Sequence, residues 1–233
     1  MTAVDDRPLL VSRHISRTKL ERELSQWDAV RDSYRRRGYW ILDRRDLTID
    51  VAFVAPVPLI RPIPVLLAVA RFDFTNYDVW APSIQFVDAA GSGPAVPLYP
   101  PVELDAAGQL HQLLLDHPTL NRQFVCFAGV REYHEHPQHS GDLWLLHRQE
   151  GHGRLAVICE RLWRAFTGVP IATQLSIGLV SDGAQLAIQW QRVSTAASQV
   201  TAPTEPATGV DQGSDANRPE PTPSSGEAAT VTE

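Results

Sequence analysis

Residues 39–74 read YWILDRRDLTIDVAFVAPVPLIRPIPVLLAVARFDF, and this stretch decides the fold. It holds three runs of β-branched, aromatic or alternating residues, which predict strands over Tyr39–Leu42, Thr48–Ala55 and Val65–Phe74. Asp and Arg residues separate the first two runs. Four prolines between positions 56 and 64 separate the last two, so we expect a loop or a sheet edge there. The strands follow one another closely, as in an antiparallel meander.

The residues before this stretch have a helical period. Apolar side chains recur at steps of three to five residues with charges between them, at Ile15, Leu20, Leu24, Trp27, Val30 and Tyr34. A helix is therefore expected over Ile15–Arg37. Ser16 or Thr18 would cap its start, and Gly38 would end it. The basic cluster Arg35–Arg37 falls at the helix end, where it complements the helix dipole.

Shorter elements are expected after the third strand. Ser83–Asp88 reads as a strand, and the Pro- and Gly-rich stretch Gly91–Pro101 reads as a surface loop. A weak helix or a turn is expected over Ala106–Asp116. Gln123–Phe127 is a short apolar run that predicts another strand, and the histidine-rich stretch after it is expected to be irregular.

The helical period returns in Gly153–Phe166, where an apolar face precedes Gly168 and Pro170. Gln174–Val180 and Gln185–Val193 predict a hairpin around a Ser-Asp-Gly turn. The order of helix, strands, loop-rich stretch, helix and hairpin indicates an α+β domain with an antiparallel sheet over residues 15–193. Residues 1–14 are expected to form a flexible arm.

The C-terminal stretch 194–233 has a different composition. It lacks Leu, Ile and aromatic residues, is rich in Pro, Ser, Thr and Ala, and carries six acidic residues against one arginine. Such a segment cannot bury enough apolar surface to offset its ordering entropy, so we predict a disordered acidic tail.

Charge and composition exclude some classes of function. The formal net charge is −6, and the tail carries five of these six negative charges, so the folded part is close to neutral. Nucleic-acid binding needs a concentrated basic face and is not expected. No apolar run reaches the length of a membrane span. Two cysteines without an export signal predict a cytoplasmic protein with reduced thiols.

The stretch from Cys126 to Arg148, CFAGVREYHEHPQHSGDLWLLHR, concentrates the metal-ligand chemistry of the chain. Imidazole and carboxylate groups are ligands of Zn²⁺, and Ni²⁺, Fe²⁺ and Mn²⁺ accept the same donors. In an extended segment His134 and His136 would point to the same side. We therefore expect a transition-metal site, best suited to Zn²⁺, with ligands from the set His134, His136, His139, Asp142 and His147. The alternative is a polar loop whose histidines bond to backbone and water.

Three roles are open for Cys126: a nucleophile, a further metal ligand, or a buried strand residue between Val125 and Phe127. The last is favoured because apolar residues flank it. Glu132 and Glu135 are candidates for a general base beside a metal-bound water, or for solvated surface charges. His152, between two glycines, is expected to be a loop residue.

The order of elements and two short segments carry a resemblance to a known family. The segment Phe74–Phe86, FTNYDVWAPSIQF, and the segment His117–Cys126, HPTLNRQFVC, together resemble the active-site region of ubiquitin-conjugating enzymes. Thr119 stands where that family has its catalytic Asn, Asn121 is displaced, and the Gly before the Cys is missing. The segment from Cys126 to Arg148 is similar to bacterial metal-binding proteins of ubiquitin-like gene neighbourhoods.

The resemblance implies a ubiquitin-conjugating-enzyme-like scaffold, and as partners a ubiquitin-like protein or its conjugation machinery. Our first hypothesis is a metal-binding protein of this kind. The second is a non-catalytic module that binds a ubiquitin-like partner. The third is a thioester transferase that uses Cys126, supported by His117 and Asn121.

Overall fold

A computed structural model describes residues 8–57, 62–180 and 183–192. Its main sheet has four antiparallel strands in the order β1-β2-β3-β4. The strands are β1 (Tyr39–Arg45), β2 (Thr48–Val57), β3 (Ile63–Asp73) and β4 (Ser83–Val87). This arrangement confirms the predicted meander and the α+β fold class. Residues 1–7 of the predicted arm and the whole predicted tail lie outside the described residues, so the domain boundaries stay predictions.

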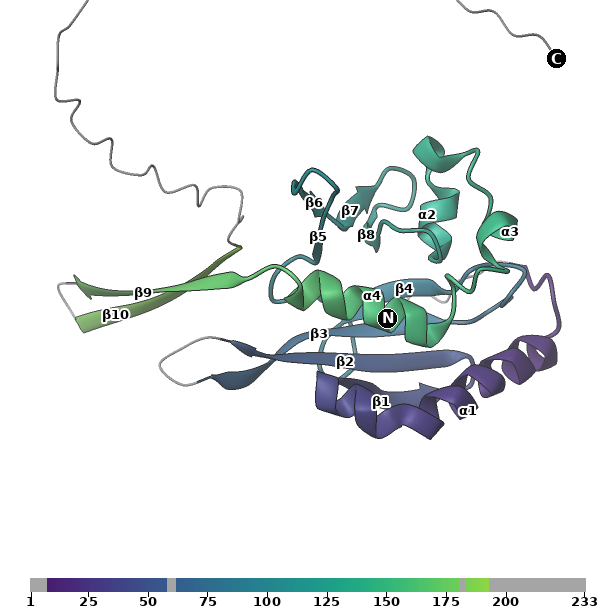
Figure 1. Cartoon of the computed structure of the whole chain (residues 1–233), viewed down its shortest axis with the longest axis horizontal. Helices are drawn as coiled ribbons and strands as arrows, with labels where there is room; N and C mark the ends of the chain where they lie inside the picture. The colour runs from purple at the N-terminus through teal and green to yellow at the C-terminus, as the bar shows by residue number, and fades with distance from the viewer. Residues whose placement is uncertain (1–7, 58–61, 181–182, 193–233) are drawn as a thin grey trace, which may run out of the picture. The chain divides into compact units, whose positions relative to one another are not determined.

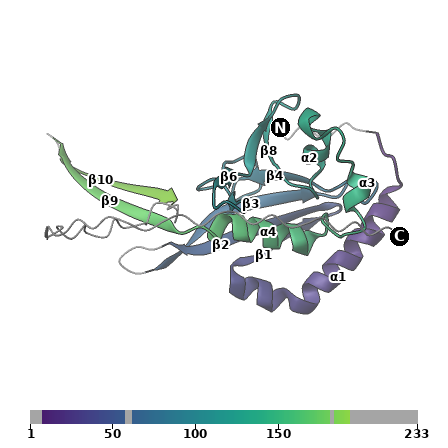
Figure 2. The ribbon, with the colours of Figure 1, turned by 45° about the horizontal axis from the view of Figure 1, so that its top comes forward.

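Helix α1 (Arg13–Arg37) precedes the sheet and packs beside β1 (Figures 1 and 2). It starts earlier than expected, because Ser12 rather than Ser16 or Thr18 is its N-cap. Gly38 ends it in the left-handed region, at φ +112°, and its N–H bonds back to the Tyr34 and Arg35 carbonyls. A side chain at this position would overlap the Val54 carbonyl, so helix and sheet meet directly at a glycine.

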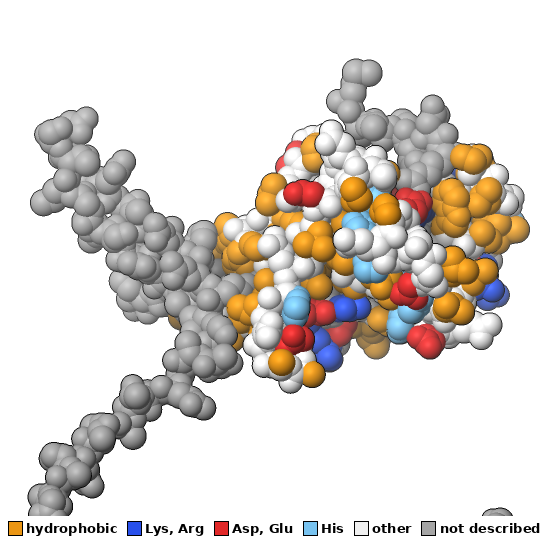
Figure 3. Space-filling view, turned by 90° about the horizontal axis from the view of Figure 1, so that it is seen from above, with side chains coloured by type: hydrophobic (Ala, Val, Ile, Leu, Met, Phe, Trp, Pro, Cys, Tyr) orange, Lys and Arg blue, Asp and Glu red, His pale blue; other side chains and the backbone are white. Residues whose placement is uncertain are grey.

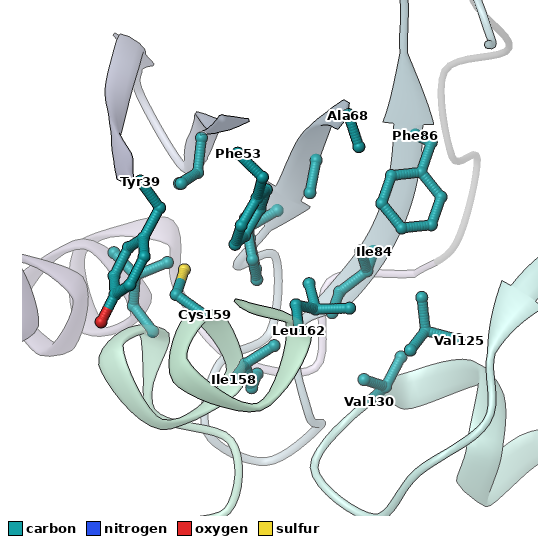
Figure 4. Packing of buried hydrophobic residues seen from close by; sticks show 14 of the residues in the cluster. Tyr39, Phe53, Ala68, Ile84, Phe86, Val125, Val130, Ile158, Cys159 and Leu162 are labelled. Carbon is teal, nitrogen blue, oxygen red and sulfur yellow. The ribbon is translucent and has the colours of Figure 1, made fainter. Parts of the chain in front are cut away.

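Helix α4 (Leu155–Thr167) lies across one face of the sheet and confirms the second predicted helix. Figure 4 shows Ile158, Cys159 and Leu162 of this helix facing side chains of the strands. All three are fully buried, as are Phe53 of the sheet and Phe166 of the helix, whose rings lie 5.7 Å apart. Burying a side chain of this size stabilises the fold by about 1.5–3 kcal/mol.

The segment between β4 and α4 contains small elements that lie together beyond α4 in Figure 1. Two hairpins come first: β5 (Val102–Leu104) with β6 (Leu110–Gln112), and β7 (Leu114–His117) with β8 (Arg122–Val125). The predicted turn near Ala106 is confirmed, but the helix offered as its alternative is wrong. Leu113 and Leu114 are buried against the core, while Leu115 and Asp116 are exposed.

Three short helical pieces then replace the irregular stretch expected around the histidines. They are α2 (Arg131–Glu135), the 3₁₀ turn η1 (Pro137–His139) and α3 (Trp144–His147). The final elements β9 (Ile171–Val180) and β10 (Gly183–Arg192) pair antiparallel and confirm the predicted hairpin. Its turn residues 181 and 182 lie outside the described residues. In the described part of the chain, no helix is both long and apolar enough to cross a bilayer.

A carboxylate from α1 holds the start of α4. Glu23 accepts the Leu155 N–H at 2.7 Å and the Tyr77 hydroxyl at 2.6 Å. Burial raises the pKa of the Glu23 carboxyl, and these two hydrogen bonds oppose that shift. The contact therefore joins α1, the segment after β3 and the first turn of α4.

We predict that Glu23→Ala lowers the free energy of unfolding by about 2 kcal/mol, because it leaves a helix N–H and a buried hydroxyl without their acceptor. Urea unfolding followed by circular dichroism measures the change. The control Glu21→Ala, at an exposed position two residues before Glu23 on the same helix, should change stability by less than about 0.5 kcal/mol. Equal losses in both variants would show that the Glu23 contact does not stabilise the fold.

Candidate metal centre

The histidine-rich segment is anchored by two buried charged residues at the start of α2. Glu132 is fully buried and accepts hydrogen bonds from the Ser83 hydroxyl and from Arg122, the latter at 2.7 Å. Burial raises its pKa, against the effect of these partners. Arg131 donates to the Thr75 carbonyl at 2.7 Å and to the Ala81 carbonyl at 3.1 Å. Glu132 is thus placed as a structural anchor of α2 and not as a base facing solvent.

Two glycines let the loop before α4 pack closely against this segment. Gly129 has φ +108°, and a Cβ there would overlap the carbonyl of His152. Gly153 lies against the indole of Trp144, which a Cβ would likewise overlap. Trp144 is buried, and its indole N–H donates to the Asp78 carbonyl at 2.9 Å. The backbone around His152 is therefore fixed from two sides.

The first histidine group is a chain of hydrogen bonds from α2 to this loop. The Tyr133 hydroxyl donates to Oδ2 of Asp142 at 2.7 Å, and Oδ1 of Asp142 lies 2.5 Å from Nε2 of His147. Nδ1 of His147 lies 3.2 Å from Nδ1 of His152. Nε2 of His152 lies 3.4 Å from Glu150. Histidine and acidic side chains lie side by side at the surface in Figure 3.

These contacts set the charge of Asp142. Its hydrogen bond with His147 and then that with Tyr133 lower the pKa of the Asp142 carboxyl. Burial, followed by the hydrogen bond to Asp142, raises the pKa of Tyr133 to about 12. Asp142 is therefore a carboxylate at neutral pH. It can accept a hydrogen bond from the protonated Nε2 of His147.

Three residues of this group can bring ligand atoms to one cation. One atom each of His147, Glu150 and His152 lies within 4.8 Å of the other two, and in the described residues this is the one such group of three. The side chains of His152 and Glu150 are 40% and 63% exposed, so solvent reaches the group. Two imidazoles and a carboxylate match the donor sets that proteins offer to Zn²⁺ and related ions.

The second group is drier and surrounds Cys126. Sγ of Cys126 lies 3.6 Å from Nε2 of His139, whose ring stacks on Tyr133 at 3.9 Å. The His136 ring stacks on Phe124 at 5.4 Å and lies 5.4 Å from the His139 ring. Ligand atoms of these residues do not converge as those of the first group do. Its members therefore pack mainly against aromatic rings.

His117 joins the second group from β7. It is almost fully buried, and its Nδ1 accepts the N–H groups of Thr119 and Leu120 at 3.3 Å each. Its Nε2 makes no hydrogen bond to a described residue. Burial lowers the pKa of His117, and the backbone of Glu132 opposes this shift only in part. Asn121 has φ +49° in the β7–β8 turn, a conformation that Asn tolerates. Both residues therefore have structural roles in this hairpin.

The structure divides the five metal ligands expected from the sequence. Asp142 and His147 meet in the first group, and His134 lies beside them, with its ring 5.4 Å from that of His147. His136 and His139 lie in the second group. The expectation that His134 and His136 share one side of an extended segment is wrong, because α2 is helical up to Glu135 and successive side chains on a helix turn away from each other.

His134 already has a partner on each ring nitrogen. Nδ1 lies 2.8 Å from the Asp142 carbonyl, and Nε2 accepts the Gly129 N–H at 3.4 Å. This arrangement holds Asp142 and Gly129 in place. Burial lowers the pKa of His134, which favours the neutral ring.

Sequence reasoning did not place Glu150 and His152 in a group that could hold a metal ion. His152 was expected to be a loop residue, which is confirmed, but this loop folds back onto α3. The spacing His147-x-x-Glu150-x-His152 was the available signal, since it gathers three donors within six positions. This signal is easily overlooked, because the glycines on both sides of His152 are typical of a mobile connection.

The two catalytic candidates differ in their surroundings. Burial raises the pKa of the Cys126 thiol, whereas a thiolate nucleophile needs a lowered pKa. His139 contacts the thiol, and the charge of Arg161 acts to lower the thiol pKa against the larger effect of burial. Glu135 is exposed at the end of α2. The catalytic roles of both residues stay predictions.

The comparisons with known proteins agree on one family. A family model described as Y4jH-like matches residues 11–99 and 94–171. The protein y4jH of Sinorhizobium fredii strain NGR234 is 35% identical over an alignment of 188 residues, and the match covers 72% of this chain and 89% of that relative. The matched residues include the sheet, both histidine groups and α4.

We predict that the second histidine group makes the fold sensitive to mild acid. Burial lowers the pKa of His117 and of His139. Below about pH 6.5 the unfolded chain therefore binds more protons at these two histidines than the folded chain does. The stability that the neutral histidines contribute is complete above that pH and is lost as the pH falls further. In EDTA, the unfolding free energy of His139→Gln should depend less on pH between 7.5 and 5 than that of the parent. The exposed control His14→Gln should match the parent, and identical slopes for all three would contradict this assignment.

Proposed function

The chain belongs to the Y4jH-like family, and we propose that it is a metal-binding protein whose ion is held by His147, Glu150 and His152. The observation that carries the proposal is the approach of two imidazole nitrogens. Nδ1 of His147 and Nδ1 of His152 are 3.2 Å apart. Two nitrogens on a tetrahedral Zn²⁺ ion, at about 2.0–2.1 Å each, would be separated by roughly 3.3 Å.

Asp142 supports the role of His147 as a ligand. It accepts a hydrogen bond from Nε2, which leaves the lone pair of Nδ1 facing His152. A carboxylate behind a ligating imidazole fixes its tautomer and orientation and increases its basicity. Tyr133 holds the other oxygen of that carboxylate. The sequence expectation thus changes in detail: His147 stays a ligand, and Asp142 becomes its supporting carboxylate.

The donor set supports Zn²⁺ as the ion. Two imidazoles and one carboxylate fill three positions of a tetrahedral site and leave the fourth for water or a ligand from solution. A bound Zn²⁺ ion would lower the pKa of such a water and polarise an oxygen that binds beside it. The exposed edge formed by Glu150 and His152 gives such molecules access.

We also propose a link to a ubiquitin-like system, and this link rests on fewer observations than the metal site does. Its support is the order of helix, four-stranded meander and later helix, together with the two short segments that resemble ubiquitin-conjugating enzymes. A ubiquitin-like protein as partner follows only from that resemblance. The metal proposal does not depend on it.

The metal content of the purified, untagged protein tests the ligand set directly. We expect about one equivalent of Zn²⁺ after loading and desalting, measured by elemental mass spectrometry. His147→Ala/His152→Ala should lose it. The matched control His136→Ala/His139→Ala removes two histidines of the second group and should keep it. Loss in the control but not in the first variant would place the metal at the second group, and no metal in the parent would refute the proposal.

A second experiment tests the supporting role of Asp142. Asp142→Ala should weaken Zn²⁺ binding by roughly 10–100-fold, because it leaves the His147 ring without its orienting carboxylate. Competition with a chromophoric chelator gives the affinity. The control Asp116→Ala removes an exposed carboxylate of β7 and should leave the affinity unchanged. An unchanged affinity in Asp142→Ala would remove Asp142 from the site.

A further inference from the structure

A second feature of the same region is a cavity of about 290 Å³ between α1 and the segment that leads into α4. Four of its lining side chains are cationic and two are acidic. The cations are Lys19, Arg22, Arg148 and Arg154, and the acids are Glu23 and Asp78. The cavity therefore has a formal excess of two positive charges.

Both acidic side chains are already engaged. Glu23 accepts hydrogen bonds from the Leu155 N–H and the Tyr77 hydroxyl. Asp78 forms an ion pair with Lys19. Neither carboxylate forms an ion pair with an arginine of the cavity, although the charge of Arg154 acts to lower the pKa of Glu23 against the larger effect of burial. The acids of the cavity thus do not neutralise its arginines by direct contact.

Three arginines reach this cavity from different parts of the chain. Arg22 comes from α1, Arg148 follows α3, and Arg154 is the N-cap residue of α4. Within residues 8–57, 62–180 and 183–192, the side chains of these three form no ion pair with a carboxylate within 4 Å. By contrast, Arg71, Arg122 and Arg161 each meet a carboxylate at 2.7–2.8 Å.

Like charges that line one cavity repel each other, and this arrangement is stable only where an anion or solvent screens them. The guanidinium group also offers pairs of N–H donors that fit two oxygens of a phosphate or carboxylate. Three such groups that line one cavity without a carboxylate partner are therefore suited to hold an oxyanion.

We propose that this cavity binds a small dianion, of the class of phosphate esters or dicarboxylates, through Arg22, Arg148 and Arg154. Two negative charges would balance the excess in the lining. The volume of about 290 Å³ is larger than a single phosphate needs, so there is room for a small organic group beside it. Gly151 and Gly153 also line the cavity, and the side chains of Arg154 and Trp144 pack directly against them.

The anion site and the proposed metal site share one loop but use different residues. Arg148 follows the ligand His147, and Arg154 lies two positions after the ligand His152. The inference goes beyond the metal proposal and stands without it, because none of the three arginines is a metal ligand.

Isothermal titration calorimetry on the full chain tests the site, with inorganic phosphate and malonate as probes at constant ionic strength, each with and without EDTA. We expect saturable binding of one equivalent. Arg22→Gln/Arg148→Gln should bind about tenfold more weakly or not at all, since it removes two charge-assisted contacts. The control Arg35→Gln/Arg36→Gln, with the same change of charge on exposed residues of α1, should bind within about twofold of the parent.

The outcomes distinguish a phosphate ester from a dicarboxylate as the ligand. They also distinguish failure of the anion site from failure of the metal site. Tighter binding of phosphate indicates a phosphate ester, and tighter binding of malonate indicates a dicarboxylate. Binding that persists in EDTA supports the arginine site whatever the metal result. Binding that disappears in EDTA would show that the anion binds a metal instead, and would overturn the inference. No saturable binding of either probe, or equal affinity in Arg22→Gln/Arg148→Gln, would overturn it as well.

Discussion

The buried carboxylate of Glu132 is the constraint on which the arrangement of the histidine-rich segment depends. A charge without solvent is tolerated only when partners surround it, and here β4 supplies Ser83 and β8 supplies Arg122. These bonds hold one turn of α2 against two strands. The directions of the next two side chains, Tyr133 and His134, follow from the position of that turn.

Tyr133 then divides the segment into two chemical environments. Its hydroxyl bonds to Asp142 in the group that contains carboxylates and reaches solvent, while its ring covers His139 in the group that contains a thiol. Imidazoles beside carboxylates are suited to a cation. Imidazoles stacked on aromatic rings are suited to packing in the neutral form. The same residue type therefore serves two purposes within one short stretch, and the basic cavity adds a third kind of environment beside them.

The sequence predicts the large elements well because their periods are long and regular. The helix over Ile15–Arg37, the strands of residues 39–74 and the helix before Gly168 follow from apolar spacing and from glycine and proline signals. The sequence predicts the structure of the segment from Ala106 to Gly153 less well. Its elements have only three to five residues, and their positions depend on distant partners such as Ser83. The approach of His147 to His152 depends on a turn that no periodic pattern encodes.

The packing of Gly129 and Gly153 around His152 has a consequence for the kinetics of ion uptake. A loop that must fold around an ion loses conformational entropy at that moment and captures the ion slowly, whereas a loop already in place avoids this loss. The backbone of His152 is held by contacts that do not involve the proposed ion. Metal-free and metal-loaded protein should therefore have the same backbone conformation, and the region would act as a rigid receptor rather than as a switch that reports metal by changing shape.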